Sequence, residues 1–271
     1  MSILPIFLLH MLLVVSLGCV GLNALAASLP GQAKQRGNLN VGVSVIVPPY
    51  VAGAKYRTPE SIETLLAEDL AARLQVSLAA LRATPANRMQ LLAGGNADVV
   101  LAAVADTDPL LRTAQVIPTG YTAAPLAILR TDTDIKQPQQ LKGRTVCLSE
   151  GGAYVGIMAA RYGATEKIYP APADSLLALR TGACDAAVHD DAMLNELLKL
   201  PEWKKFSARL PVGPRTALVL IAPAGDADTL AFLKKTARAW AESSYWPQIR
   251  KKWANDVAFE VYLDQNVPDC H

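Results

Sequence analysis

The chain has 271 residues, of which 51% are hydrophobic and 18% charged, so it can bury a sizeable core and is not disordered in bulk. Its length suits two domains of ordinary size or one large domain. The formal net charge is +2 and no run of lysine or arginine occurs, which argues against nucleic acid or an anionic membrane surface as the main partner.

The first 27 residues are typical of a secretion signal. Residues 3–25 are nearly all apolar and uncharged, and an A-x-A cleavage pattern follows at Ala24-Leu25-Ala26. We therefore predict a signal peptide over residues 1–26, cleaved near Ala26, and a periplasmic mature protein. A membrane-spanning anchor is the alternative, because the apolar run is about long enough for one. Cys19 leaves lipid anchoring open.

Strand and helix patterns alternate along the mature chain, after a polar leader at residues 28–38. The β-rich or apolar runs predict strands over residues 39–47, 78–84, 98–104, 125–130, 144–148, 167–169, 186–188 and 216–222. Helical spacing or capping residues predict helices over residues 61–74, 87–93, up to about 162, up to about 180, 191–200, 226–243 and 246–253, with a mixed tail from 255. Such alternation in two blocks is typical of two open parallel sheets.

One motif occurs twice. Leu92-x-x-Gly95-x-x-Asp98 and Leu179-x-x-Gly182-x-x-Asp185 share one frame, and a short apolar run follows each copy. Glycine after a helix tolerates the left-handed backbone, and the apolar run suits a strand covered on both faces. The two copies predict two similar α/β lobes, in which both aspartates form turns.

Three cysteines follow the predicted signal, namely Cys147, Cys184 and Cys270. An exported compartment permits a disulfide, while an odd count leaves at least one thiol unpaired within the chain. Because Cys147 and Cys184 lie near predicted strands, we expect each to be a small buried hydrophobe. No C-x-x-C motif occurs, so neither a redox motif nor a structural zinc site is predicted.

The sequence lacks the motifs of common enzymes. Of the three histidines only His189 lies inside the predicted fold, and there is no G-x-S-x-G, Walker loop or G-x-G-x-x-G. We therefore predict no metal, no cofactor and a protein that is not an enzyme.

Candidate ligand groups lie at strand ends, where open α/β sheets bind ligands. Arg112 suits a bidentate bond to a carboxylate, although a surface arginine is the alternative. Asp190 ends a predicted strand and suits an ammonium group, or caps the next helix. Thr107 offers a hydroxyl and an N–H group. Gly151-Gly152 opens a predicted helix whose free N–H groups suit an anion, unless it is only a tight turn.

The order of these residues resembles that of the type II periplasmic solute-binding proteins, in the polar amino-acid family of the ABC importers (family 3 extracellular solute-binding proteins). The resemblance covers roughly residues 38–253. The similar motifs are Leu39–Val43, Pro48-Pro49-Tyr50, Ser61–Ala67, the two Leu–Gly–Asp turns, the Thr107 and Arg112 pair, Tyr121, Asp185–Asp190 and Trp253. The chain departs from the family pattern at Ser61, Leu65 and Glu150-Gly151-Gly152.

The resemblance implies a two-lobed α/β fold in which two open, mostly parallel sheets are joined by a two-strand hinge. Lobe 1 would comprise residues 38–124 and 220–271, and lobe 2 residues 125–219, with crossovers near 123–127 and 218–220. The resemblance also implies a monomer that binds a small amino-acid-like or carboxylate solute by hinge closure and docks on the membrane permease of an ABC transporter.

The resemblance further implies roles for the candidate residues. Thr107 and Arg112 would bind the α-carboxylate of the solute, and Asp190 its α-ammonium group. Tyr50 would pack on the ligand side chain. The candidate binding residues are completed by Ala105, Glu150, Gly151 and Gly152.

Two other functions remain open. A periplasmic enzyme on the same scaffold, similar to the dehydratases that resemble these binding proteins, would use Glu150 or His189 as an acid. An accessory or sensor protein with no transport role would bind a protein partner on its surface.

Overall fold

The computed structural model describes residues 28–47, 52–53, 55–224, 226–242 and 244–265. The predicted signal peptide and lipid-anchor candidate Cys19, the candidate ligand residue Tyr50, and Cys270 lie outside these residues. No helix among the described residues is long and apolar enough to cross a bilayer.

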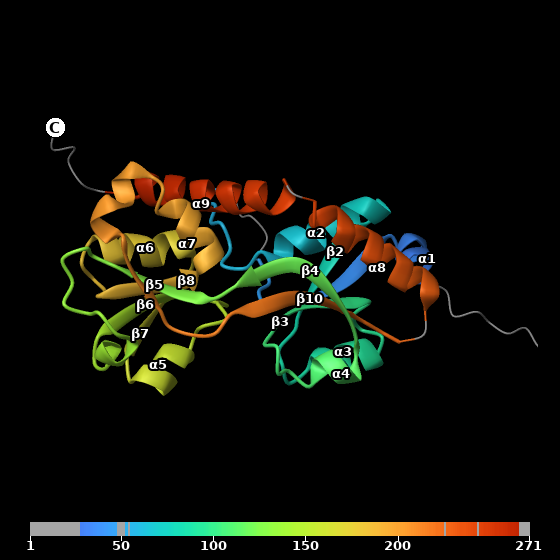
Figure 1. Cartoon of the computed structure of the whole chain (residues 1–271). Helices are drawn as coiled ribbons and strands as arrows, with labels where there is room; N and C mark the ends of the chain where they lie inside the picture. The colour runs from blue at the N-terminus through green and yellow to red at the C-terminus, as the bar shows by residue number, and fades with distance from the viewer. Residues whose placement is uncertain (1–27, 48–51, 54, 225, 243, 266–271) are drawn as a thin grey trace, which may run out of the picture.

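Two five-stranded sheets form the centres of the two lobes (Figure 1). The first has the order β2-β1-β3-β10-β4, with strands β1 (Asn38–Val43), β2 (Ser77–Arg82), β3 (Val99–Val104), β4 (Gln115–Ala123) and β10 (Thr216–Ala222). The second has the order β7-β6-β8-β5-β9, with strands β5 (Pro125–Leu129), β6 (Thr145–Ser149), β7 (Thr165–Tyr169), β8 (Ala186–Asp190) and β9 (Ala208–Pro211).

One strand in each sheet runs against the others. β1 pairs in parallel with β2 and β3, and β6 with β7 and β8. β10 and β5 are antiparallel to both of their neighbours. Each of these two strands follows a crossing of the chain from the other sheet. The predicted α/β fold with two open, mostly parallel sheets is confirmed.

The chain crosses between the sheets at two places. β4 continues through Ala124 into β5, within the first predicted crossover at residues 123–127. The second crossing is made by residues 212–215, which lead from β9 into β10. Leu218–Leu220, expected at the second crossover, instead lie inside β10 and pair with β3 and β4. The return to the first sheet is therefore complete at Thr216. The apolar run predicted this strand but carried no signal of which sheet it joins.

Helices cover both faces of each sheet (Figure 1). In the first lobe, one face carries α1 (Leu29–Arg36), α2 (Glu63–Leu74) and α8 (Ala227–Trp240), and the other carries α3 (Arg88–Ala93) and α4 (Leu110–Thr113). In the second lobe, one face carries α6 (Pro172–Arg180), α7 (Asp191–Leu197) and the 3₁₀ turn η2 (Pro201–Phe206), and the other carries α5 (Ile157–Tyr162) and the turn η1 (Pro138–Leu141). This double cover explains the continuous apolar strands.

The last helix, α9 (Tyr245–Leu263), packs mainly on α6 and α7 of the second lobe. We had predicted residues 220–271 to belong to the first lobe, with a mixed tail from 255. β10 and α8 do pack in the first lobe, but the helix continues to Leu263 because Trp253, Val257 and Val261 form a buried stripe. The described C-terminal part of the chain therefore contributes to both lobes.

Residues 28–38 are not the polar leader that we predicted. They form α1 and the start of β1, and Leu29 and Ala33 of α1 are buried. The backbone N–H of Leu29 donates to Thr229 Oγ1 at 2.8 Å, which ties α1 to α8. Two apolar residues are too few to reveal this helix in the sequence.

The repeated Leu–Gly–Asp motif has the same structure in both lobes. Gly95 and Gly182 have φ angles of 66° and 79°, in the left-handed region that glycine tolerates. Asp98 Oδ2 accepts from the Asn40 backbone N–H at 2.8 Å. The Asp185 carboxylate accepts from the backbone of β6 at the same distance. The prediction that both aspartates form turns is confirmed.

Cys147 on β6 and Cys184, in the turn before β8, form a disulfide with a Cα–Cα distance of 5.9 Å. Both side chains are buried, as predicted. The sequence had left a disulfide open, and the structure forms it because the turn before β8 places Cys184 beside Cys147 of β6.

Candidate functional site

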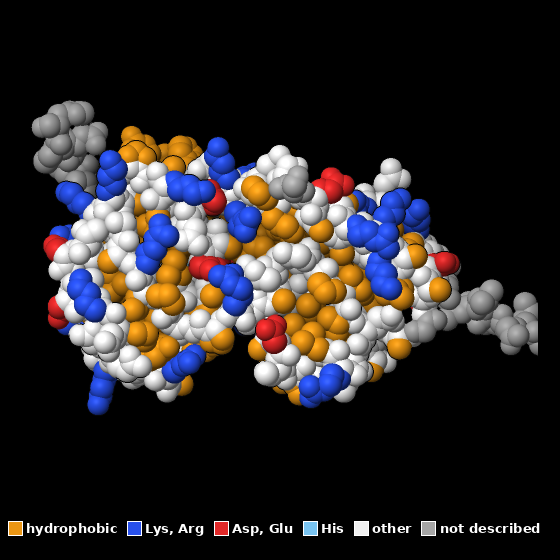
Figure 2. All heavy atoms as spheres, in the orientation of Figure 1, with side chains coloured by type: hydrophobic (Ala, Val, Ile, Leu, Met, Phe, Trp, Pro, Cys, Tyr) orange, Lys and Arg blue, Asp and Glu red, His pale blue; other side chains and the backbone are white. Residues whose placement is uncertain are grey.

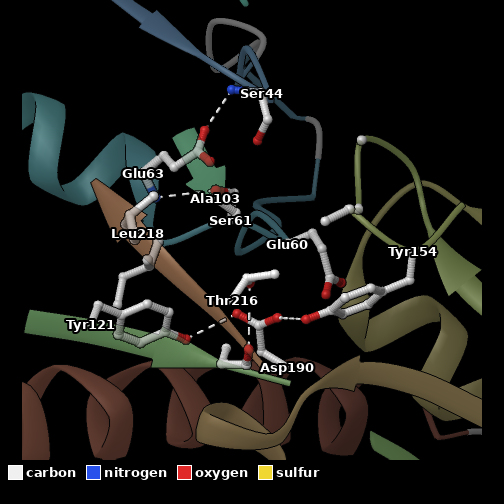
Figure 3. A pocket seen from close by; sticks show the side chains of 15 residues that line it. Ser44, Glu60, Ser61, Glu63, Ala103, Tyr121, Tyr154, Asp190, Thr216 and Leu218 are labelled. Atoms are coloured by element: carbon white, nitrogen blue, oxygen red, sulfur yellow. Dashed lines mark hydrogen bonds between the residues drawn. The ribbon is translucent and has the colours of Figure 1, made fainter. Parts of the chain in front are cut away.

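A small cavity of about 50 Å³ lies where the two lobes meet (Figure 3), and we call it the inner cavity. Both lobes contribute to it, which makes it the inner end of a cleft. Its lining comprises Ser44, Glu60, Ser61, Ile62, Glu63, Ala103, Tyr121, Ala123, Gly151, Gly152, Ala153, Tyr154, Asp190, Thr216 and Leu218.

Asp190, at the end of β8, lies at the base of this cavity. Its carboxylate accepts a hydrogen bond from the Tyr121 hydroxyl at 2.9 Å and a second one from the Tyr154 hydroxyl. It occupies the N-cap position of α7 but makes no capping hydrogen bond. Burial raises the pKa of Asp190 to about 6, and nearby Glu60 adds to this, while the two tyrosine hydrogen bonds oppose it. The carboxylate therefore accepts hydrogen bonds from cleft residues and does not cap the helix.

The two tyrosines act as hydrogen-bond donors. Burial and the neighbouring Asp190 carboxylate raise the pKa of both Tyr121 and Tyr154, so their hydroxyls stay protonated. Tyr121 comes from β4 of the first sheet, whereas Asp190 and Tyr154 belong to the second lobe. The Tyr121–Asp190 hydrogen bond therefore joins the lobes across the cleft.

Glu63, at the first position of α2, provides a second carboxyl group. It is 5% exposed, and its Oε2 accepts from the Ser44 backbone N–H at 2.5 Å (Figure 3). Burial raises the pKa of Glu63 to about 7, against the opposing effect of that hydrogen bond. Near neutral pH this group can hold or release a proton.

Glu60 is held by a buried chain of hydrogen bonds. Glu60 Oε2 lies 2.7 Å from His189 Nδ1, and His189 Nε2 lies 2.7 Å from Ser175 Oγ. Because the single Ser175 hydroxyl proton is directed to Pro172 O at 3.0 Å, Nε2–H is the donor to Ser175. Nδ1 of the same ring faces Glu60, so the imidazole bridges Glu60 and Ser175. Neither His189 nor Ser175 lines the inner cavity.

Residues 57–60 link the lobes. They precede α2 of the first lobe, yet Arg57 forms an ion pair with Asp174 of α6 at 2.8 Å. Thr58 Oγ1 donates to Glu260 of α9 at 2.6 Å. Together with the Glu60–His189 pair, these contacts attach the segment to the second lobe and place Glu60 in the cleft.

Two glycines allow the lobes to touch. Gly151 has a φ of 74°, and a Cβ atom added there would lie 2.6 Å from the Val45 side chain of the first lobe. A Cβ atom on Gly152 would lie 3.2 Å from the Glu60 side chain. We had predicted that this pair opens a helix and offers free N–H groups to an anion. The helix is not there, because α5 begins only at Ile157, and the pair lies in a tight turn, which was the alternative.

A larger chamber of about 470 Å³ extends outward from the inner cavity, and we call it the outer chamber. Figure 2 shows the molecule hollowed between its lobes, with hydrophobic side chains on both sides of the gap. Six residues line both spaces: Ser44, Glu63, Ala103, Ala153, Tyr154 and Thr216. The rest of the chamber is mostly apolar, with Ala83, Pro85, Val100, Ile157, Val212 and Pro214 among its lining, and it includes Arg88 and Arg161.

The sequence-predicted site residues divide into two groups. Asp190, Gly151 and Gly152 line the inner cavity. Arg112 is exposed on α4 and lines neither space, because Leu110 of the same short helix is buried in the core and Arg112 lies on the opposite side. Three further candidates also line neither space: Ala105, Thr107 and Glu150. The expected pairing of Arg112 with Asp190 across the cleft is therefore not formed.

Sequence reasoning missed Glu60, Glu63 and Tyr154 as cleft residues. An acidic residue at the start of a helix favours the helix dipole, so Glu63 had an ordinary explanation. Glu60 and Tyr154 lie in loops outside any motif. Near Glu60 and Glu63, the sequence predicted burial only for Ile62, which belongs to the apolar pattern of the predicted helix.

No protein-family model matches the chain, and no curated protein matches it in sequence. Several solved structures are similar. A mutant of ArgBP from T. maritima has a TM-score of 0.56 and 22% identity over 84% of this chain and 99% of that one. The amino acid ABC transporter substrate-binding protein AbpA from Streptococcus pneumoniae, bound to L-arginine, has a TM-score of 0.56 and 17% identity over 83% and 98%.

A third similar structure is described as an ancestral amino-acid-binding protein, a precursor of cyclohexadienyl dehydratase. It has a TM-score of 0.55 and 20% identity, and the match covers 83% of this chain and 99% of that one. At these identities the likeness is one of fold. The predicted two-lobed periplasmic-binding-protein-like fold is thereby confirmed, and it is the fold of amino-acid ABC transporter substrate-binding proteins.

Proposed function

We propose that the protein is the substrate-binding component of an ABC importer and binds a small amine-bearing solute in the cleft between its lobes. The observation that carries this proposal is the inner cavity, in which Asp190 of one lobe and Tyr121 of the other meet. Amino acids and their relatives are the first candidates, because similar structures belong to amino-acid ABC transporter proteins.

The mechanism is closure of the lobes around the solute. A solute that contacts both lobes binds the closed arrangement better, and this difference shifts the population. A carboxylate has about four acceptor positions, of which the tyrosine hydroxyls use two at Asp190, so an ammonium group can join them. Charge-assisted hydrogen bonds of about 1.5–3 kcal/mol each are compatible with micromolar affinity, at roughly −8 kcal/mol.

The proposed place of action is the periplasm. The signal-like N-terminus supports export, and the Cys147–Cys184 disulfide supports an oxidising compartment. The exported monomer would then present its closed form to a membrane permease.

Calorimetric titration with a panel of amino acids and amines tests this proposal. We expect at least one micromolar ligand, and a loss of tenfold or more in its affinity in Asp190→Asn. Asp132→Asn is the matched control, because the Asp132 carboxylate is exposed and pairs with Arg130 outside the cleft. A ligand whose affinity is the same in wild type and Asp190→Asn would exclude the cleft as its site.

A second candidate is an enzyme on the same scaffold. The observation that favours it is the pair of cleft carboxyls with pKa values raised to about 6 and about 7, at Asp190 and Glu63. Acid–base catalysis needs groups that exchange protons near the working pH. Recovery of every bound compound unchanged after long incubation, followed by NMR, would exclude this function.

A further inference from the structure

We propose that the cleft selects an amine that carries an apolar body and no carboxylate, with the ammonium group in the inner cavity and the body in the outer chamber. This proposal rests on the proposed function, because it concerns the same cleft and names the chemistry of its solute.

The charges of the inner cavity favour a cation. Its lining contains Glu60, Glu63 and Asp190 but no lysine or arginine. Glu60 already has a partner, because its Oε2 lies 2.7 Å from His189 Nδ1. Among the described residues, no positively charged side chain pairs with Glu63 or Asp190, whose hydrogen-bond donors are a backbone N–H group and two tyrosine hydroxyls. A ligand cation would supply the missing partner for these two carboxyl groups.

The volume of the inner cavity limits what enters. At about 50 Å³ it is much smaller than the outer chamber of about 470 Å³. Its walls meet where Gly151 approaches Val45 and Gly152 approaches Glu60. The ammonium group is therefore placed in this small inner space and the larger apolar body in the outer chamber.

A ligand carboxylate next to the ammonium group would also lack a partner within the inner cavity. In an α-amino acid it is bonded to the carbon that carries the ammonium group, so it would lie beside Glu63 and Asp190 and be repelled by them. Arg88 lines the outer chamber, but its Nη2 already contacts both oxygens of Asp108, at 3.2 and 2.9 Å. Arg112 lines neither space. Burial of an unpaired carboxylate is costly, so the site rejects it.

The outer chamber suits the rest of the molecule. It is continuous with the inner cavity through Glu63 and Tyr154. Its volume of about 470 Å³ is within the range of small-molecule sites, and its apolar lining rewards burial of a ring or an alkyl chain. Arg161 lines the chamber but not the inner cavity, and its guanidinium lies over the Tyr162 ring.

Matched pairs of compounds test the proposal. 2-Phenylethylamine and phenylalanine, like tyramine and tyrosine, differ only in the carboxylate. We expect each amine to bind the wild-type mature chain at least tenfold more tightly than its amino acid in calorimetry at pH 8, and Asp190→Asn to lose this binding. Tighter binding of the amino acids, with the same dependence on Asp190, would overturn this inference and leave the proposed function standing. Binding of no amine and no amino acid would overturn both.

A second pair of variants tests the outer chamber. Ile157 and Ile168 are 40% and 46% exposed, but only Ile157 lines the chamber. We expect Ile157→Asn to weaken the binding of 2-phenylethylamine at least threefold and Ile168→Asn to leave its affinity unchanged. Both variants should unfold cooperatively on heating. Equal affinities in the two variants would contradict the placement of the apolar body.

Discussion

Replacing Asp190 by asparagine is expected to stabilise the ligand-free protein at alkaline pH while it removes ligand binding. Asp190 is buried against Tyr121 and Tyr154, and its pKa is raised from 3.8 to about 6. Asparagine has nearly the same shape and no charge, so it avoids the desolvation that raises this pKa. A binding carboxylate kept at the expense of stability is a common trade-off at functional sites.

The pKa difference sets the size and the sign of the effect. A rise from 3.8 to about 6 at Asp190 corresponds to about 3 kcal/mol, at 1.36 kcal/mol per pKa unit. As the pH increases above 3.8, the unfolded state releases this proton while the folded state keeps it until about pH 6. The wild-type protein therefore loses stability between these two pH values, and Asp190→Asn does not.

Urea unfolding at pH 4 and pH 8 measures this difference. The free energy of unfolding of Asp190→Asn, relative to wild type, should increase by about 2 kcal/mol from pH 4 to pH 8, since part of the shift already lies below pH 4. Asp132→Asn must not show this gain, because Arg130 lowers the pKa of Asp132 and the sign is opposite. A relative stability that is the same at both pH values would refute the assignment of a raised pKa to Asp190.

Three further predictions concern the closed lobes, the disulfide and the cleft carboxyls. Gly151→Val should weaken ligand binding at least tenfold and increase the radius of gyration in X-ray scattering, because its Cβ would lie 2.6 Å from the Val45 side chain. Adding Val45→Ala should restore part of the affinity. Unchanged affinity and radius of gyration in Gly151→Val would contradict contact between the lobes. Replacing both Cys147 and Cys184 by alanine should lower the free energy of unfolding by about 4 kcal/mol in urea titrations, because the disulfide closes a loop with a sequence separation of 37 residues. An unchanged midpoint would contradict this prediction. Amine binding should strengthen from pH 5 to pH 8, because Glu63, with a pKa of about 7, loses its proton over this range. Calorimetry in two buffers should detect proton release on binding. Weaker binding at pH 8 would contradict a role of the Glu63 carboxylate in binding the amine.

The fold was predictable because it follows local patterns. The apolar run at residues 216–222 coincides with β10, and the two Leu–Gly–Asp motifs form equivalent turns. Membership in a lobe was harder to predict, because a buried strand or helix has the same pattern whichever lobe covers it. α9 shows this, since its apolar stripe predicted burial but not its packing on α6 and α7.

The site was predictable only in part. Asp190 is the last residue of β8, so the topology brings it to the cleft. Arg112 was expected there by resemblance, but burial of Leu110, two residues before it, turns α4 so that Arg112 is exposed. Glu60 reaches the cleft through long-range contacts of residues 57–60 with α6, α9 and β8. Contacts of this kind leave no periodic signal in a sequence.

A crystal structure of the protein with its tightest-binding amine is the most direct test of a solute site in the cleft. The account predicts that the ligand nitrogen donates to the Asp190 carboxylate beside Tyr121 and Tyr154, and that the apolar body fills the outer chamber. A ligand bound elsewhere, such as beside Arg112 on the surface, with the cleft closed and empty, would contradict it.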